Sequence, residues 1–342
     1  MVLNLTLLER LLHRLHILPT PIMDAFGGVI FGRVLTIAVR RGVFEAVATH
    51  SLSVEEIARA TQFHSKGVEL IADAFVVGGY LKRVGEKYII SEEGKKWLLQ
   101  SSPHYLGNLI HYFETLYSRW GSFEHSLEHG HPERSYFEVF TEKDWETYVY
   151  GMRDLAKLLL NEVKPKLILP NNPKSLLDIG GSHGLYAIEC CRRYPTLHAT
   201  VMDFELALRH TSEIVKAEGM SERISVLEGD FTKNELPPNQ DCILMFNIIH
   251  GLSEEENQRL IAKSFDALNA GGRLFILDQM KEKKSRSGLA EFLPLMVGLN
   301  LLNEIGGNVY AVDAVKGWCS GFSSVNKHTL RLPGVTLVEA VK

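Results

Sequence analysis

The pattern of apolar and polar positions changes near residue 174. From there, short apolar runs alternate with stretches that have the spacing of amphipathic helices, and the runs are "SLLDI", "HATVMD", "RISVLEGD", "DCILMFN" and "GRLFILD". Strands that alternate with helices form a mainly parallel sheet covered on both faces. The end of the chain has two apolar runs around Pro333-Gly334, which predict a hairpin and therefore one antiparallel strand.

One helix of this region has recognisable ends. In "SEEENQRLIAKSFDAL", Ser253 and Glu256 have the spacing of a capping box, which satisfies free backbone groups at a helix start. Glycine favours the end of a helix, so we expect this helix to stop at Gly271-Gly272.

The N-terminal third has a helical pattern with a single interruption. "SLSVEEIARAT" and "SKGVELIADAFVVGGYLKRV" predict two successive helices, the first capped by Ser53 with Glu56 and the second ending near Gly78-Gly79. "KRVGEKYIIS" then predicts two short strands joined at Gly85. Two helices followed by such a hairpin are typical of a winged helix-turn-helix.

We therefore expect three parts in the chain: a winged-helix domain in residues 1–115, a helical linker in 116–165, and an α/β domain in 166–342. The linker is rich in aromatic side chains, which favours packing between domains. Because small-molecule pockets also form at domain junctions, some of these rings could wall a substrate site.

Composition and charge narrow the function. The chain has 342 residues, of which 45% are hydrophobic and 23% charged, and its net charge is −4, which is ordinary for a soluble globular protein. Between Ser51 and Gln100, seven Lys and Arg residues stand against seven Asp and Glu residues. Phosphate neutralisation supplies most non-specific affinity for DNA, so the winged helix is expected to serve packing or dimerisation and not nucleic-acid binding.

The first residues, "MVLNLTLLERLLHRLHILPTP", are leucine-rich but interrupted by charges, and they lack a signal-peptide cleavage site. They predict an amphipathic helix that needs a partner: another subunit, the rest of the chain, or a membrane surface. No apolar run reaches the roughly 18 residues that span a bilayer, so we expect no membrane span.

The four cysteines, Cys190, Cys191, Cys242 and Cys319, lie in apolar stretches. This pattern predicts buried free thiols and a reducing, cytoplasmic compartment. Neither the cysteines nor the histidines have the spacing of metal ligands, and we expect no metal.

Polar side chains follow the apolar runs of the predicted sheet. Asp178, Asp203, Asp230, His250 and Asp278 each stand where a strand ends or just beyond it. The carboxyl ends of parallel strands meet at one edge of a sheet, where ligands of open α/β folds bind. The sequence therefore predicts a ligand site built from these residues.

The glycine turn "DIGGSHG" indicates the kind of ligand. Asp178 precedes the glycines, and its carboxylate would repel a pyrophosphate but suits a cationic group. Gly180 and Gly181 allow the backbone to approach a ligand closely, and Gly184 lets the following helix pack tightly.

The ends of the next two strands indicate the other parts of the ligand. Asp203 is expected to accept hydrogen bonds from ribose hydroxyls, Asp230 to accept from an adenine amino group, and Phe231 to pack on the base. These features imply an adenosine with a positive, amine-bearing tail and no phosphate, and S-adenosylmethionine fits that description.

The segments "GRVLTIAVRRGVFEAV", "YLKRVGEKYIISEEGKKWL", "LLDIGGSHG", "LEGDF", "IIHGLSEEE" and "AGGRLFILDQ" follow one another as in a known family. Over nearly its whole length the sequence resembles the S-adenosylmethionine-dependent small-molecule O-methyltransferases with an N-terminal winged-helix dimerisation domain. That family includes the plant caffeate and the acetylserotonin O-methyltransferases and bacterial enzymes of secondary metabolism.

The resemblance implies a Rossmann-like methyltransferase domain with a mostly parallel seven-stranded sheet and an antiparallel C-terminal strand, after an all-α/winged-helix domain. It implies a homodimer formed by the N-terminal domain, a small-molecule acceptor, and S-adenosylmethionine that is converted to S-adenosylhomocysteine.

The resemblance also assigns roles. His250 is the general base and Asp278 orients it, because an imidazole with a pKa near 6.5 can take the proton of a phenol with a pKa of about 10 during attack. The expected cofactor residues are Asp178, Gly180, Gly181, His183, Gly184, Asp203, Phe204, Gly229, Asp230, Phe231 and Asn247, and the expected substrate residues are Met152, Arg153, Asn300 and Asn303.

Alternatives remain for several of these residues. His250 could be only a hydrogen-bonded histidine at the start of a helix, Arg153 could form a salt bridge, and Asn300 and Asn303 could face solvent. Gly251 stands where many family members have an acid after the histidine, and "GGNVYAV" lacks a second supporting acid. These departures leave room for N- or C-methylation or for a non-methylating enzyme. The other competing functions are a DNA-binding regulator and a pseudoenzyme.

Overall fold

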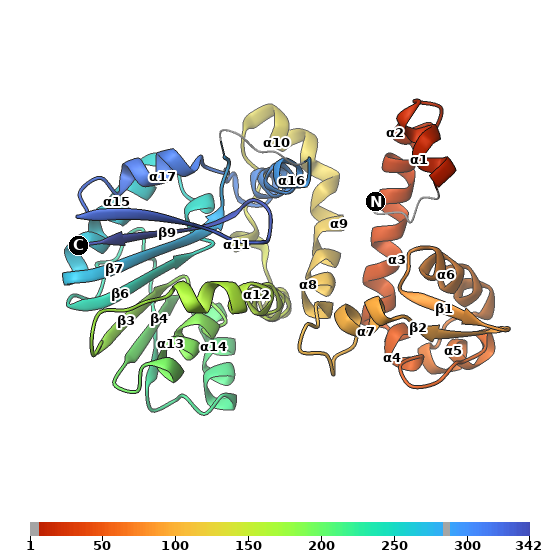
Figure 1. The fold of residues 1–342 in the computed structure, drawn as a ribbon, viewed down its shortest axis with the longest axis horizontal. Coiled ribbons are helices and arrows are strands. Elements are labelled where there is room, and N and C mark those ends of the chain that lie inside the picture. The colour runs from red at the N-terminus through yellow and green to blue at the C-terminus, as the bar shows by residue number, and fades with distance from the viewer. Residues whose placement is uncertain (1–6, 283–287) are drawn as a thin grey trace. The chain divides into compact units, whose positions relative to one another are not determined.

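The computed structural model describes residues 7–282 and 288–342, so the first six residues of the leucine-rich segment lie outside the described part. The chain divides into two compact units, one up to Leu116 and one from Tyr117 onward. Figure 1 shows both, and each is described by itself below.

The first unit is helical with one hairpin. Ser53 and Glu56 form the expected capping box, and Leu81 pairs with Ile90 in the antiparallel hairpin that the sequence predicted. Its elements are α1 (Leu7–Arg14), α2 (Thr20–Ile22), the π-helical η1 (Met23–Gly27), α3 (Gly28–Arg40), α4 (Val43–Ala46), α5 (Val54–Thr61), α6 (Ser65–Val77), β1 (Leu81–Val84), β2 (Lys87–Ile90), α7 (Glu92–Leu98), α8 (Gly107–Tyr112) and η2 (Phe113–Thr115).

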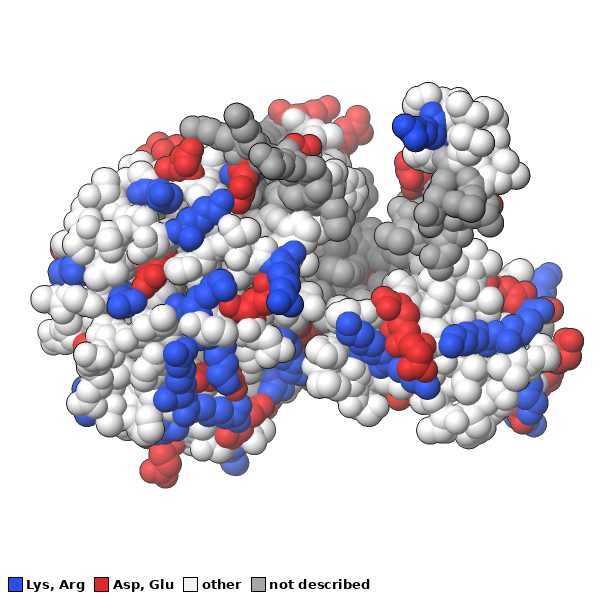
Figure 2. All heavy atoms as spheres, viewed as in Figure 1, with Lys and Arg blue, Asp and Glu red and all other residues white. Residues whose placement is uncertain are grey.

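Two cations of the hairpin, Arg83 and Lys87, have acidic partners. Arg83 pairs with Asp73 at 2.5 Å, and Lys87 pairs with Glu56 at 3.3 Å. Figure 2 likewise shows Lys and Arg interspersed with Asp and Glu over much of the face that it draws. The hairpin region therefore offers paired charges and not a row of free cations.

The helix Thr20–Arg40, formed by α2, η1 and α3, exposes a row of apolar side chains that includes Ile22, Phe26 and Val29. Its length and composition would allow it to cross a membrane, and only 11% of its most apolar stretch is buried. Core helices of soluble proteins and signal sequences have the same length and composition, so the absence of a membrane span stays a prediction.

The second unit is built on a seven-stranded sheet of order β5-β4-β3-β6-β7-β9-β8. Strands β3 to β7 are mutually parallel, whereas β9 runs antiparallel to both β7 and β8, as predicted from the C-terminal hairpin. The strands are β3 (Ser175–Ile179), β4 (His198–Asp203), β5 (Ile224–Glu228), β6 (Gln240–Phe246), β7 (Leu268–Gln279), β8 (Ser324–Thr329) and β9 (Val335–Val341).

Helices cover both faces of this sheet (Figure 1). Alternate strand residues face opposite cores: Leu176 packs with α12, α13 and α14, and Leu177 packs with α15 and α17. The helices after η2, of which α9 and α10 do not lie on the sheet, are α9 (Leu116–Arg119), α10 (Phe123–His129), α11 (Tyr136–Val139), α12 (Glu142–Val163), α13 (Leu185–Arg193), α14 (Glu205–Ala217), α15 (Glu254–Ala267), α16 (Gly288–Ile305) and α17 (Val312–Trp318), with the 3-10 turns η3 (Trp120–Ser122), η4 (Lys164–Lys166) and η5 (Ile249–Gly251).

The order of the strands locates the site. From β3 the chain moves outward to β4 and β5, then returns to the other side of β3 to form β6 and β7. Such a reversal opens a crevice at the carboxyl ends of the two central strands.

One helix boundary differs from the expectation. Helix α15 starts with the predicted capping box at Ser253 but ends at Ala267, before Gly271-Gly272, which belong to β7. The ammonium group of Lys342 bonds the carbonyl oxygens of Phe265 and Leu268 at 2.6 and 2.7 Å, so a distant residue caps the helix end in place of a glycine.

We expect Ser253→Ala to destabilise the protein by about 1 kcal/mol, because the cap of α15 is lost. Ser253→Asp, which keeps a capping oxygen, should retain stability close to that of the unsubstituted protein. Chemical unfolding followed by circular dichroism would measure the difference. Equal stability of the alanine and aspartate variants would contradict the cap's contribution.

Candidate active site

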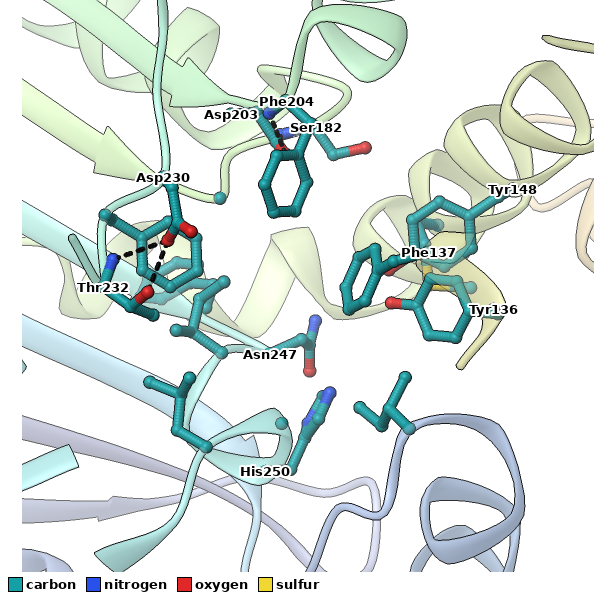
Figure 3. A pocket seen from close by; sticks show the side chains of 18 of the residues that line it. Tyr136, Phe137, Tyr148, Ser182, Asp203, Phe204, Asp230, Thr232, Asn247 and His250 are labelled. Carbon is teal, nitrogen blue, oxygen red and sulfur yellow. Dashed lines mark hydrogen bonds between the residues drawn. The ribbon is translucent and has the colours of Figure 1, made fainter. Parts of the chain in front are cut away.

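A cavity of about 210 Å³ opens at the carboxyl ends of β3 and β6. Its wall includes Gly180 and Ser182 after β3, Asp203 at the end of β4, and Asn247 and His250 after β6. In Figure 3, these polar groups and the rings of α11 and α12 surround a common central space. The structure thus brings together residues that the sequence assigned to one site.

The turn after β3 depends on glycine. The backbone of Gly180 has a φ of +62°, and a Cβ atom there would lie 2.2 Å from Cδ1 of Ile248. A Cβ at Gly181 would lie 2.7 Å from Oδ2 of Asp178. Side chains at either position would collide with the wall of the cavity or with the acid beneath it.

Asp178 lies beneath this turn and does not line the cavity itself. It is 1% exposed, and no hydrogen bond reaches its Oδ2 from any residue that the structure describes. Burial, followed by the nearby charge of Asp203, raises the pKa of Asp178 to about 8. A cationic group would relieve both effects, which agrees with the sequence-based expectation of an amine-bearing ligand.

Asp203 is also buried but better supported. It accepts hydrogen bonds from the backbone N–H groups of Ser182 at 2.9 Å and Phe204 at 2.8 Å (Figure 3). Burial raises the pKa of Asp203 to about 6, although these two bonds act in the opposite direction. The two carboxyl groups therefore differ in how readily they ionise.

His183 lines the cavity as a neutral side chain. Its Nδ1 accepts a hydrogen bond from the backbone N–H of Leu185 at 3.0 Å. Burial, and then the positive charges of Arg153 and Lys157, lower the pKa of His183 to about 3. The proton of this imidazole consequently lies on Nε2.

Asp230 and Phe231 line the cavity as predicted, but the carboxylate of Asp230 already has partners. It accepts from the N–H of Thr232 at 2.9 Å and from Lys233 Nζ at 2.9 Å. Partial burial opposes ionisation of Asp230, but the bonds from Thr232 and Lys233 outweigh it and lower the pKa. An adenine amino group would have to share this carboxylate.

Two predicted glycines support the site from outside the cavity wall. A Cβ at Gly229 would lie 2.7 Å from Cε of Met202. Gly184 has a φ of +65° at the start of α13. Both glycines allow the backbone to take its course beside the site, and neither lines the cavity.

Aromatic side chains of α11 and α12 form the facing wall. The Phe137 and Phe204 rings are 5.4 Å apart, and Tyr136 and Phe137 are 4.1 Å apart. Trp145 and Tyr148 continue this wall. The sequence pointed to the aromatic segment as a whole but could not select these four members of α11 and α12, because selection depends on the packing of both helices against the strand ends.

His250 and Asp278 form the central polar pair. Nδ1 of His250 lies 2.7 Å from Oδ1 of Asp278, which is fully buried and also accepts from the N–H of Gln279 at 2.8 Å. With Nδ1–H donated to the carboxylate, Nε2 of His250 keeps its lone pair. The His250 side chain is 18% exposed and lines the cavity, so this lone pair is available to a ligand.

The four expected substrate residues separate into two groups. Met152 lines the cavity, whereas Arg153 forms an ion pair with Glu218, so the salt-bridge alternative describes Arg153. Asn300 accepts from Nε1 of Trp120 at 3.3 Å.

Asn303 is buried, which excludes the solvent-facing alternative. It accepts from Oγ of Ser126 at 3.0 Å and donates to the carbonyl oxygen of Arg119 at 3.3 Å. Arg153, Asn300 and Asn303 therefore hold helices together, and the structure does not bring them to the cavity.

The sequence missed several lining residues. Ser182, Thr232, Phe246, Ile248 and Ile305 all contribute to the wall. Ser182 adjoins the glycine turn and could have been found from its position, but Ile305 reaches the cavity only through the packing of α16. In residues 7–282 and 288–342, no group of three His, Cys, Asp or Glu side chains is arranged to hold a metal, and all four cysteines are free and buried.

A family profile described as the O-methyltransferase domain matches residues 122–314, more than half of the chain. The chain belongs to the O-methyltransferase domain family. It is a methyltransferase, as expected from the sequence, and its mixed seven-stranded Rossmann-like fold is that of the family.

Relatives of known activity cover most of the chain. The 3-hydroxy-5-methyl-1-naphthoate 3-O-methyltransferase of Streptomyces sahachiroi is 25% identical, with 94% of each chain covered. The tetracenomycin polyketide synthesis 8-O-methyl transferase TcmO of Streptomyces glaucescens is 26% identical over 86% of this chain and 88% of its own. The N,N-dimethyltransferase OxyT of Streptomyces rimosus is 24% identical over 72% and 74%.

Solved structures share the fold. Human N-acetylserotonin methyltransferase in complex with SAM has a TM-score of 0.82 and 21% identity, covering 100% of this chain and 99% of its own. PigF with SAH has a TM-score of 0.81 and 21% identity, covering 95% and 100%. S-adenosylmethionine, the cofactor expected from the sequence, is the methyl donor of this family.

In this O-methyltransferase-family chain, Ser182 in the cavity wall and Asp178 beneath that wall have groups that suit such a donor. Oδ2 of Asp178 and Oγ of Ser182 are buried without hydrogen-bond partners in the described part of the chain. Buried polar atoms are normally bonded, so these two atoms fit a polar ligand that supplies the missing bonds.

We expect the affinity for S-adenosylhomocysteine, which keeps the amine, to rise between pH 6 and pH 8.5. Asp203 and Asp178, with pKa values of about 6 and 8, must lose their protons to accept hydrogen bonds from the ribose hydroxyls and to pair with the ammonium group, so binding releases protons in this range. Calorimetry in buffers of different ionisation enthalpy would measure the release.

Asp178→Asn should remove the part of this rise above pH 7 and weaken binding at least tenfold. A flat affinity across the range in the unsubstituted protein, or an unchanged profile in the variant, would contradict the role of Asp178.

Proposed function

We propose that the protein transfers a methyl group from S-adenosylmethionine to a hydroxyl of an aromatic or polycyclic small metabolite, with His250 as the general base. The observation that carries this proposal is the 2.7 Å bond between Nδ1 of His250 and buried Asp278. It leaves Nε2 as a proton acceptor at the cavity beside an aromatic wall.

The donor would be held by groups around the glycine turn and the strand ends. Asp178, Gly180, Gly181 and His183 suit its amino-acid tail, with Nε2–H of His183 as a hydrogen-bond donor. S-adenosylmethionine, when bound, supplies an electrophilic methyl group on a sulfonium. The adenosine part would meet Asp203, Phe204, Asp230, Phe231 and Asn247, with Gly184 and Gly229 shaping the backbone beneath.

His250 would take the proton of the acceptor hydroxyl as the oxygen attacks the methyl carbon. The Asp278 carboxylate stabilises the imidazolium that forms and keeps the ring in one tautomer. Because displacement at a sulfonium needs little help from the leaving side, positioning and deprotonation are the main contributions of the chain.

The acceptor class rests on the aromatic wall and on two relatives named for O-methylation of a naphthoate and of a polyketide. Flat rings pack favourably against Phe137, Tyr148 and Phe204. N-methylation is the second candidate, since the relative OxyT is an N,N-dimethyltransferase. An amine acceptor would need less help from His250.

The first unit is proposed to be a winged-helix domain that forms a homodimer in the cytoplasm. Supporting this, Ile22, Phe26, Val29 and Ile30 along one helix are 46–70% exposed, an apolar row that another subunit could cover. The paired cations of the hairpin favour this role over DNA binding. The buried free thiols fit a reducing compartment.

Replacing His250 with alanine should lower turnover at least a hundredfold on a phenolic acceptor, because no group remains to take the proton. Binding of S-adenosylhomocysteine should stay within twofold. Transfer of labelled methyl to a panel of hydroxynaphthoates would measure turnover. Activity close to that of the unsubstituted protein would exclude His250 as the base, and loss of both activity and binding would indicate a structural effect.

The double variant Phe26→Glu/Val29→Glu should convert a dimer to monomers, since two charges would be buried in the contact. Sedimentation velocity would measure this, with Lys66→Glu, an exposed site outside the apolar row, as control. A monomer before substitution would contradict the dimer, and binding of that monomer to lipid vesicles would assign the row to a membrane surface.

A further inference from the structure

Asn257 holds the turn that carries His250 at two points. It lies in the N-terminal part of α15, and its side chain has no exposed surface. Its Nδ2 donates to the carbonyl oxygen of Ile249 at 2.9 Å and to that of Leu252 at 3.3 Å. One amide group thus bonds the residue before the histidine and the second residue after it.

The orientation of this amide follows from its partners. Both partners are acceptors, so only the nitrogen, with its two hydrogens, can face them. No described residue provides a hydrogen bond to Oδ1 of Asn257. An apolar residue at this position would take a donor away from the carbonyl oxygens of Ile249 and Leu252, which costs stability as well as order. The two carbonyl contacts are what Asn257 contributes.

Two further groups bond the same turn. The hydroxyl of Tyr310 donates to the carbonyl oxygen of Leu252 at 2.6 Å, and the N–H of Asn308 donates to that of His250 at 2.8 Å. Asn257 nevertheless has a distinct position, because it alone among these groups spans the turn from Ile249 to Leu252.

The turn has two backbone hydrogen bonds of its own, from the N–H of Gly251 to the carbonyl oxygen of Ile248 at 3.0 Å and from the N–H of Leu252 to that of Ile249 at 3.4 Å. Gly251 follows the histidine, and glycine gives the backbone the largest conformational freedom. A Cβ at Gly251 would lie 3.2 Å from Cδ1 of Ile305, so the site has little room for a larger side chain. The external hydrogen bonds therefore add to the order that the two internal bonds provide.

We propose that Asn257 is a positioning residue for methyl transfer, which keeps Nδ1 of His250 on Asp278 and Nε2 toward the cavity. This inference rests on the proposed role of His250 as the base. Without the amide, the carbonyls of Ile249 and Leu252 lose a shared donor and the turn can rotate. A displacement of a reacting group by about 1 Å can cost roughly a hundredfold in rate.

The test compares Asn257→Leu, which keeps the side-chain size but removes the donor, with Ser264→Ala. Ser264 is equally buried on α15, and its hydroxyl bonds only groups away from the turn, at Leu260 and Met245. With a hydroxynaphthoate acceptor, Asn257→Leu should lower kcat at least tenfold, with KM for S-adenosylmethionine within twofold. Ser264→Ala should keep both values within twofold.

A double variant shows whether Asn257 acts through His250. In the His250→Ala background, Asn257→Leu should cause less than a twofold further loss, because the group that it positions is already absent. A full tenfold additional loss would overturn the inference. If His250→Ala itself keeps its activity, the proposed base is wrong, whatever Asn257 does.

A spectroscopic measurement tests the inference without an acceptor. In protein labelled with nitrogen-15 histidine, the His250 signals are those missing in His250→Ala. They should report a proton on Nδ1 in the unsubstituted protein and in Ser264→Ala, and a mixture of tautomers in Asn257→Leu. Should Asn257→Leu fail to fold, Asn257→Ser, whose hydroxyl is too short to span the turn, replaces it. An unchanged Nδ1–H tautomer in the folded variant would overturn the inference.

Discussion

The reversal of strand order between β3 and β6 is the constraint on which the site depends. Because β3, β4, β6 and β7 are parallel, their carboxyl ends lie at one edge, and residues far apart in the sequence become neighbours there. Asp178, Asp203, His250 and Asp278 come from four different strand ends or the turns after them. No local motif could bring them together without this topology.

Three buried carboxyl groups at that edge differ in what surrounds them, and the difference separates their roles. Asp278 has an imidazole and the backbone N–H groups of His250 and Gln279 as partners. Asp203 has two backbone N–H groups, and Asp178 keeps one oxygen without a partner among the described residues. The first can orient a base, while the last suits a ligand that brings its own positive charge.

Much of this arrangement could be predicted from the sequence. The apolar runs predicted all seven strands of the sheet, and the capping boxes at Ser53 and Ser253 were found where expected. These features are local, since neighbouring residues in the sequence determine a cap or a strand. The end of α15 was predicted wrongly because the residue that caps it, Lys342, is far away in the sequence, just after the last strand.

The roles of the expected substrate residues were harder to predict, because they too depend on partners that are distant in the sequence. Asn300 and Asn303 share a helix face, but their partners lie near residue 120, and the spacing alone could not distinguish these partners from a substrate. Asn257 went unnoticed because nothing in "SEEENQRL" distinguishes a buried amide from a solvated one. Side-chain partners across elements are a property of packing, which periodicity does not encode.

The most direct test of the account is the atom to which the methyl group is transferred. S-adenosylmethionine with a carbon-13 methyl group would be incubated with the protein and a panel of hydroxynaphthoates and polycyclic phenols, with matched aromatic amines in the same panel. The account predicts a labelled carbon bound to oxygen in the product, identified by NMR. Label on nitrogen or carbon, or no transfer by protein that binds S-adenosylhomocysteine, would contradict it.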